Sequence, residues 1–173
     1  IYLKRLIKNL KDLNIKKLIL PMEGESQVKF ENVDSYVFVL KKICKYSYKF
    51  NIEILIESNI SPNLFSILKK RINMKNFFLL YDTGNRAFLK ENLYQDLLSF
   101  GKNVNHIHLK DKNKFNKNVM INTGVVNFLK IFRNLKKISY KKSFTIEATR
   151  GKDPMKTAKK NLLYFRNLIK KYK

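Results

Sequence analysis

The chain has 173 residues, of which 45% are hydrophobic and 13% aromatic, and this suits one folded domain and excludes a wholly disordered segment. Lys and Arg number 37 against 13 Asp and Glu, so the formal net charge is +24. The sequence contains no run of about 18 apolar residues and no signal-peptide pattern, so we expect a soluble, cytoplasmic protein without a membrane partner.

In chain order, short apolar runs alternate with longer amphipathic segments, the first of them a predicted helix around residues 3–13. The apolar runs predict β-strands over residues 17–22, 52–57, 77–82, 104–109 and 144–147. Ser61-Pro62 and Asp153-Pro154 are helix-start signals, and Gly101 is predicted to end a helix. This alternation of strands and helices predicts a parallel sheet covered by helices, the α/β class.

The single cysteine, Cys44, excludes a disulfide framework and a cysteine-based zinc site. It lies in an apolar helical pattern, so we expect a buried structural thiol. No glycine-rich phosphate loop follows a predicted strand, and a nucleotide-binding Rossmann or P-loop domain is therefore not predicted.

The basic charge is at first sight typical of a nucleic-acid-binding protein. Few of the basic residues are Arg, however, and the lysines are scattered over every segment of the chain. An AT-rich genome encodes such Lys- and Asn-rich sequences for any soluble protein. We favour that explanation and do not expect a nucleic-acid partner.

Titratable side chains stand at the carboxyl ends of four successive predicted strands: Glu57, Asp82, His108 and Glu147. Any one of them could be a solvated loop residue, but in a closed β/α barrel these strand ends converge on one face. Three carboxylates and one imidazole suit one divalent cation, Mn, Mg, Co, Fe or Zn. Without a cation, the carboxylates would repel one another.

Five segments together resemble the sugar phosphate isomerase/epimerase family of the xylose isomerase-like TIM barrel superfamily. They are ILIES (54–58), FFLLYDTGN (77–85), VNHIHLKD (104–111), INTGVVNFLKIFRNL (121–135) and FTIEATRGKDP (144–154). The resemblance implies a (β/α)8 barrel, of which residues 1–173 form a single partial domain holding strands four to eight. A whole barrel needs about 250 residues, so we expect either a longer natural protein or a second chain that supplies three more β/α units.

The resemblance also implies that Glu57, Asp82, His108 and Glu147 bind one divalent metal, with Glu57 and Glu147 as the acid/base pair. A metal-bound carbonyl acidifies the adjacent C–H, so one glutamate can remove a proton and the other can return it. Return to the same carbon gives an epimer, and return to the neighbouring carbon gives an aldose–ketose isomer. The expected partner is a small sugar or sugar phosphate, and a homo-oligomer remains open.

Five further residues are predicted to bind substrate: His106, Asn85, Arg150, Lys110 and Glu23. His106 shares a strand face with His108, and a core histidine is the alternative. Arg150 follows the last strand, where barrels often bind phosphate, and an exposed helix-capping arginine is the alternative. Asn85 stands where some family members have His, and Lys110 and Glu23 could instead be ordinary surface residues.

Two other functions remain open. An AP endonuclease, a DNA-repair phosphodiesterase on the same barrel, would suit the charge of +24. Its three-zinc cluster uses many histidines, however, whereas this chain has only His106 and His108. Asn85 stands where the endonuclease pattern has a further histidine. A truncated, inactive fragment is the remaining alternative.

Overall fold

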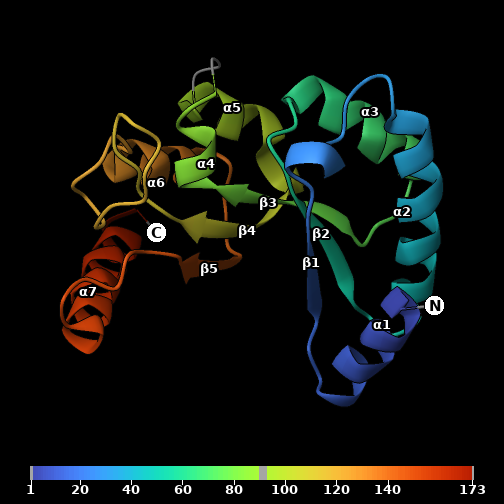
Figure 1. Cartoon of the computed structure of the whole chain (residues 1–173), viewed down its shortest axis with the longest axis horizontal. Coiled ribbons are helices and arrows are strands. Elements are labelled where there is room, and N and C mark those ends of the chain that lie inside the picture. The colour runs from blue at the N-terminus through green and yellow to red at the C-terminus, as the bar shows by residue number, and fades with distance from the viewer. Residues whose placement is uncertain (1, 90–92, 173) are drawn as a thin grey trace. The chain divides into compact units, whose positions relative to one another are not determined.

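The structure, a computed structural model, describes residues 2–89 and 93–172 (Figure 1). The helices are α1 (Tyr2–Asp12), α2 (Val33–Tyr48), α3 (Pro62–Ile72), α4 (Thr83–Arg86), α5 (Leu93–Phe100), α6 (Phe128–Lys137) and α7 (Pro154–Tyr172), with short 3-10 turns η1 (Gly24–Ser26) and η2 (Gly101–Asn103). The strands are β1 (Lys17–Pro21), β2 (Glu53–Glu57), β3 (Phe77–Asp82), β4 (Val104–Leu109) and β5 (Ser143–Ile146). Each strand lies within one residue of its predicted range, and the α/β class is confirmed.

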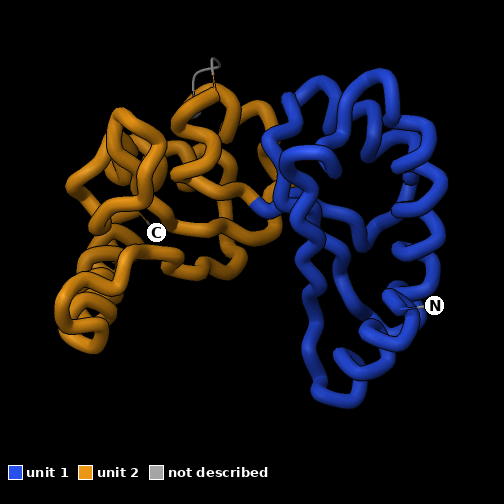
Figure 2. Tube along the Cα trace, in the orientation of Figure 1, with its two compact units in different colours: residues 1–80 blue, residues 81–173 orange. Residues whose placement is uncertain are grey.

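The chain divides into two compact units, residues 1–80 and 81–173 (Figure 2). The strands follow one another in chain order, β1-β2-β3-β4-β5, and β3 carries the chain from the first unit into the second. The prediction that residues 1–173 form one domain stays a prediction.

In the first unit, β1, β2 and the start of β3 pair in parallel, with Ile56 in register with both Leu20 and Leu79. The β2 residues Ile54, Leu55 and Ile56 are completely buried. Near-continuous apolar runs of this kind are what strands buried on both faces require.

Cys44 belongs to this core and is fully buried on α2, as predicted. Burial disfavours the thiolate and raises the pKa of the Cys44 thiol to about 12, although the charge of Lys69 opposes the shift. The free cysteine is therefore a packing residue, and its thiol stays protonated at neutral pH.

In the second unit, β4 and β5 pair in parallel, with His108 in register with Thr145. Aromatic side chains from α6, α7 and β5 form part of its core. The ring of Phe165 lies 5.1 Å from that of Phe128, and the ring of Phe132 stacks 5.6 Å from that of Phe144. These rings pack the two helices against β5.

The predicted helix-start signals are confirmed at the N-termini of α3 and α7. The Ser61 hydroxyl accepts the N–H of Leu64 ahead of α3, and the Asp153 carboxylate accepts the N–H of Lys156 in the first turn of α7. Gly101 has a positive φ of 50° directly after α5, where a side chain would be strained. Of the helices in the described residues, none combines the length and apolar content that crossing a bilayer demands.

Candidate metal centre

Asp82 ends β3 and is the most deeply buried acid of the centre, with 3% of its surface exposed. Its Oδ1 accepts the backbone N–H of Asn85 at 2.7 Å, so this carboxylate is the N-cap of α4. Its other oxygen, Oδ2, faces β4 and lies 3.9 Å from Nδ1 of His108. The cap therefore fixes the direction in which the carboxylate points.

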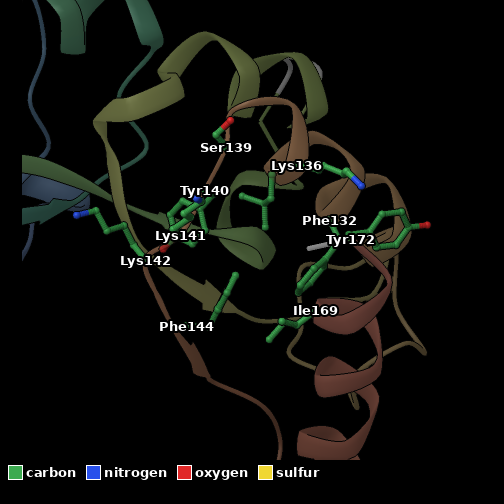
Figure 3. Close-up of a pocket in the computed structure, with 10 residues that line it drawn as sticks. Phe132, Lys136, Ser139, Tyr140, Lys141, Lys142, Phe144, Ile169 and Tyr172 are labelled. Carbon is green, nitrogen blue, oxygen red and sulfur yellow. The ribbon is translucent and has the colours of Figure 1, made fainter.

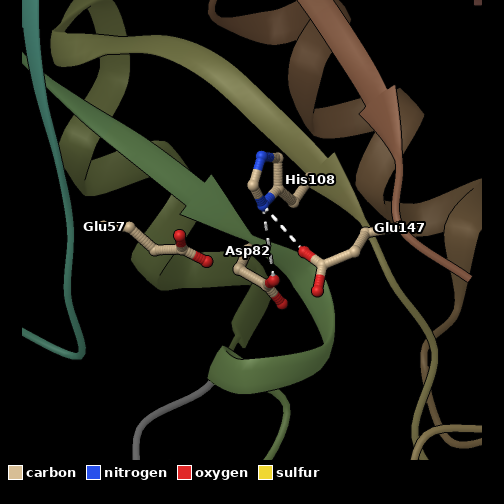
Figure 4. A group of neighbouring side chains, drawn as sticks. All are labelled: Glu57, Asp82, His108 and Glu147. Carbon is tan, nitrogen blue, oxygen red and sulfur yellow. Dashed lines mark ion pairs between the residues drawn. The ribbon is translucent and has the colours of Figure 1, made fainter. Parts of the chain in front are cut away.

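His108 and Glu147 complete the part of the centre that lies in the second unit. Nδ1 of His108 lies 2.9 Å from Oε2 of Glu147. Dashed lines in Figure 4 join the imidazole of His108 to the carboxylates of Asp82 and Glu147. One ligand atom from each of Asp82, His108 and Glu147 lies within 4.8 Å of the others. Glu147 is 44% exposed at its side chain, whereas Asp82 and His108 are largely buried, so solvent reaches the cluster at Glu147.

Lys110 is buried beside these carboxylates. Its Nζ lies 2.5 Å from Oε1 of Glu147 and 3.3 Å from Oδ2 of Asp82. Burial alone would lower the pKa of the Lys110 ammonium, but the hydrogen bond to Glu147 and the charge of Asp82 outweigh it and raise that pKa. The alternative of a surface position for Lys110 is wrong.

This lysine changes the electrostatic argument for a metal. The chain itself supplies one positive charge to the carboxylate cluster, so mutual repulsion of the acids does not by itself require a cation. The case for a metal rests instead on the ligand chemistry, in which carboxylate oxygens and an imidazole nitrogen stand close enough to share one ion.

Glu57 closes β2 in the first unit and is half-buried. Its carbonyl accepts the N–H of Met22 at 2.7 Å, which ties the end of β2 to the residue after β1. Glu57 is in register with Leu80, two residues before Asp82 on β3. The strand-end position predicted for Glu57 is thus observed.

The other predicted substrate-binding residues lie in different surroundings. Both ring nitrogens of His106 contact β5 hydroxyls, Nδ1 with Ser143 at 2.8 Å and Nε2 with Thr145 at 2.9 Å, as expected of a satisfied core histidine. Asn85 is half-buried in α4, Arg150 is exposed between β5 and α7, and Glu23 is exposed just before η1.

The sequence reasoning missed how Thr83 and Gly84 contribute. Thr83 is fully buried, and its hydroxyl bonds the backbone of Lys110, while Gly84 lies against the Lys110 side chain. Strand alternation places His106 and His108 on one face of β4, and Lys110, the residue directly after the strand, continues the same alternation. This was the available signal for the lysine.

Asp111 has a separate structural role that the sequence reasoning also missed. It is buried, and its carboxylate accepts the N–H groups of Gly124 at 2.9 Å and Val126 at 3.2 Å. These bonds hold the loop that follows β4. They also account for a buried acid next to the predicted centre that offers no ligand to it.

A groove in the second unit lies away from this chemistry. It is bordered by α6, β5 and α7, with apolar residues such as Phe132, Phe144 and Ile169 and with Tyr140, Lys141 and Tyr172 (Figure 3). Its lining includes neither a carboxylate nor an imidazole. The groove therefore lacks the groups that bind a metal or exchange a proton near neutral pH.

Comparison with known proteins places the chain among β/α barrels. The sequence model of the family described as xylose isomerase-like TIM barrel matches residues 2–168. An uncharacterized protein of Methanocaldococcus jannaschii is 25% identical over 138 residues, which cover 73% of this chain and 47% of that protein. The chain thus spans about half the length of the curated relative it matches.

Solved structures show the same fold at low sequence identity. A D-allulose 3-epimerase from Methylomonas sp. is 18% identical with a TM-score of 0.81, and the match covers 96% of this chain and 68% of that one. A xylose isomerase domain protein from Planctomyces limnophilus is 18% identical with a TM-score of 0.81, and the match covers 99% of this chain and 64% of that one. The IolI protein, solved with a bound zinc atom, is 19% identical with a TM-score of 0.82, and the match covers 99% of this chain and 69% of that one.

Proposed function

Since this chain belongs to the xylose isomerase-like TIM barrel family, we propose that it carries the metal centre of a sugar or sugar-phosphate isomerase or epimerase. The observation that carries the proposal is the convergence of Asp82, His108 and Glu147 within 4.8 Å at the ends of consecutive strands. In barrels of this kind, the carboxyl ends of the strands form the active face. We propose that β1 to β5 correspond to the fourth to eighth strands of the family's barrel.

The residues present fit a divalent cation. Carboxylate oxygens and one imidazole nitrogen suit Mn, Mg, Co, Fe or Zn, and such a set leaves positions open for substrate. We propose Glu57 as the fourth ligand, because it ends the strand that pairs with β3, on which Asp82 stands. When bound, the cation supplies Lewis-acid stabilisation of negative charge on the substrate oxygens.

Glu147 is the proposed base that faces substrate. It is the most exposed member of the second-unit cluster, while its two oxygens contact His108 and Lys110 and so hold the carboxylate in place. A fixed carboxylate can remove a proton from the carbon beside a carbonyl, with Glu57 as the partner acid. The carbon that receives the returned proton determines epimerisation or isomerisation.

The substrate class is proposed from the similar solved structures. Several of them are epimerases of ketoses, including a D-allulose 3-epimerase and an L-ribulose 3-epimerase. The DNA-repair alternative finds less support, because both ring nitrogens of His106 contact β5 hydroxyls and His108 alone offers an imidazole to the centre. A small carbohydrate is therefore the proposed substrate.

The proposal is tested by titrating the purified chain with Mn²⁺, Mg²⁺, Co²⁺ and Zn²⁺ in a calorimeter, followed by assays on a panel of ketoses and ketose phosphates. We expect one metal site per chain, loss of binding in Asp82→Asn, and at least a hundredfold loss of turnover in Glu147→Gln. Exposed Glu25→Gln is the matched control, because it removes an acid outside the cluster.

Two results would contradict the proposed function. Absence of divalent-cation binding by the wild-type chain would remove the metal centre. Metal-dependent cleavage of abasic-site DNA without sugar turnover would replace the isomerase with the endonuclease.

A further inference from the structure

We propose that Lys110 is a built-in competitor of the metal, whose ammonium holds Asp82 and Glu147 and sets how tightly the centre binds a divalent cation. This inference rests on the proposed function, since it concerns the regulation of the same centre. The Lys110 ammonium is a positive charge of the chain itself, and it contacts the same carboxylates that a metal would use.

The first support is the position of the ammonium. Nζ of Lys110 lies 2.5 Å from Glu147 and 3.3 Å from Asp82, and the lysine side chain is only 9% exposed. These are two of the residues that offer ligand atoms to a metal. A divalent cation must therefore share these oxygens with the ammonium or displace it, and the two positive charges repel each other.

The second support is the way the backbone of Lys110 is held. The N–H of Lys110 donates to Oγ1 of Thr83 at 2.9 Å, and the Thr83 hydroxyl donates to the Lys110 carbonyl at 2.7 Å. Thr83 directly follows Asp82, so one buried hydroxyl fixes the start of the lysine side chain beside the first carboxylate.

The third support is the space left for the side chain. A Cβ added at Gly84 would lie 2.6 Å from Cγ and 3.0 Å from Cδ of Lys110. Gly84 has no positive φ, so the close approach of the lysine, and not the backbone conformation, is what disfavours a larger residue there. The segment Asp82-Thr83-Gly84 therefore provides a carboxylate, a backbone anchor and a channel for one lysine.

The inference predicts that removing the ammonium tightens metal binding. In Lys110→Met, a side chain of similar length keeps the channel filled without a charge. Mn²⁺ titration calorimetry should give a Kd at least tenfold lower than that of the wild type. Lys112→Met is the matched control, because Lys112 contacts Asn116 at 3.0 Å away from the centre, and it should leave Kd within twofold.

Thermal unfolding gives a second readout that does not depend on turnover. Without metal, Lys110→Met should melt at a lower temperature than the wild type, because the carboxylates lose their counter-ion. Saturating Mn²⁺ should raise the melting temperature of Lys110→Met by more than it raises that of the wild type. Gly84→Ala, which displaces the lysine without removing its charge, should tighten Mn²⁺ binding in the same direction and carries the test if Lys110→Met does not fold.

The outcomes separate this inference from the proposed function. If the wild type binds Mn²⁺ and Lys110→Met binds it equally or more weakly, the competition is wrong and the metal centre stands. If neither chain binds Mn²⁺, both proposals fail. Binding by Lys110→Met alone would support the competitor role of the ammonium, but it would overturn the proposed metal-dependent function of the wild-type chain.

Discussion

The buried ion pair between Arg86 and Asp96 provides a sharp test of how the second unit is held together. Nε of Arg86 donates to Oδ2 of Asp96 at 2.5 Å, and both side chains are only 2% exposed. The guanidinium also lies over the rings of Tyr81 and Phe100, at 5.3 and 4.7 Å from their centroids. The pair links α4, which Asp82 caps, to α5.

Arg86→Leu should destabilise the folded chain by about 3–5 kcal/mol, because it leaves a carboxylate buried without its cation. The Coulomb estimate agrees, since two unit charges about 4 Å apart interact by about 4 kcal/mol at an effective dielectric constant of about 20. The low exposure of both side chains means that solvent screening does not reduce this figure as it would at the surface.

The assay is urea unfolding followed by far-UV circular dichroism for Arg86→Leu, Asp96→Leu and the double variant. Each single variant should lose several kcal/mol, whereas the double variant should lose less than the sum, because removing both charges leaves neither one unpaired. Single variants that each cost under about 1 kcal/mol, or strictly additive losses, would refute the reasoning.

Three further predictions concern other parts of the chain. The pKa of Cys44 is raised in the folded state, so its stabilising effect is complete below pH 9.0 and is lost as pH rises towards about 12; alkaline unfolding of Cys44→Ala should lack this slope. Phe165→Ala should cost about 3–5 kcal/mol in urea unfolding, and a smaller loss would mean that the aromatic core re-forms around it. Ser61→Ala should cost about 1 kcal/mol through the lost cap, and no change in unfolding would contradict that role.

Much of the fold could be predicted from the sequence because the relevant signals are local. Apolar runs of four to six residues, N-cap residues before prolines and a glycine after α5 each act within one turn or one strand. The positions of Asp82, His108 and Glu147 at or beside strand ends followed directly from those runs. Their convergence followed from the parallel topology, in which all strands end at the same edge.

The sequence by itself thus determined the strands, the starts of α3 and α7, the end of α5, and the acids and imidazole offered to a metal, since each depends on neighbours close in the chain. Only the tertiary structure decided where Lys110 points and what His106 contacts. A lysine side chain is a flexible four-carbon stem that can point in many directions. The direction of the Lys110 side chain depends on Thr83 and Gly84, which lie 27 and 26 positions earlier in the chain. Long-range packing therefore placed a cation of the protein's own among the predicted metal ligands.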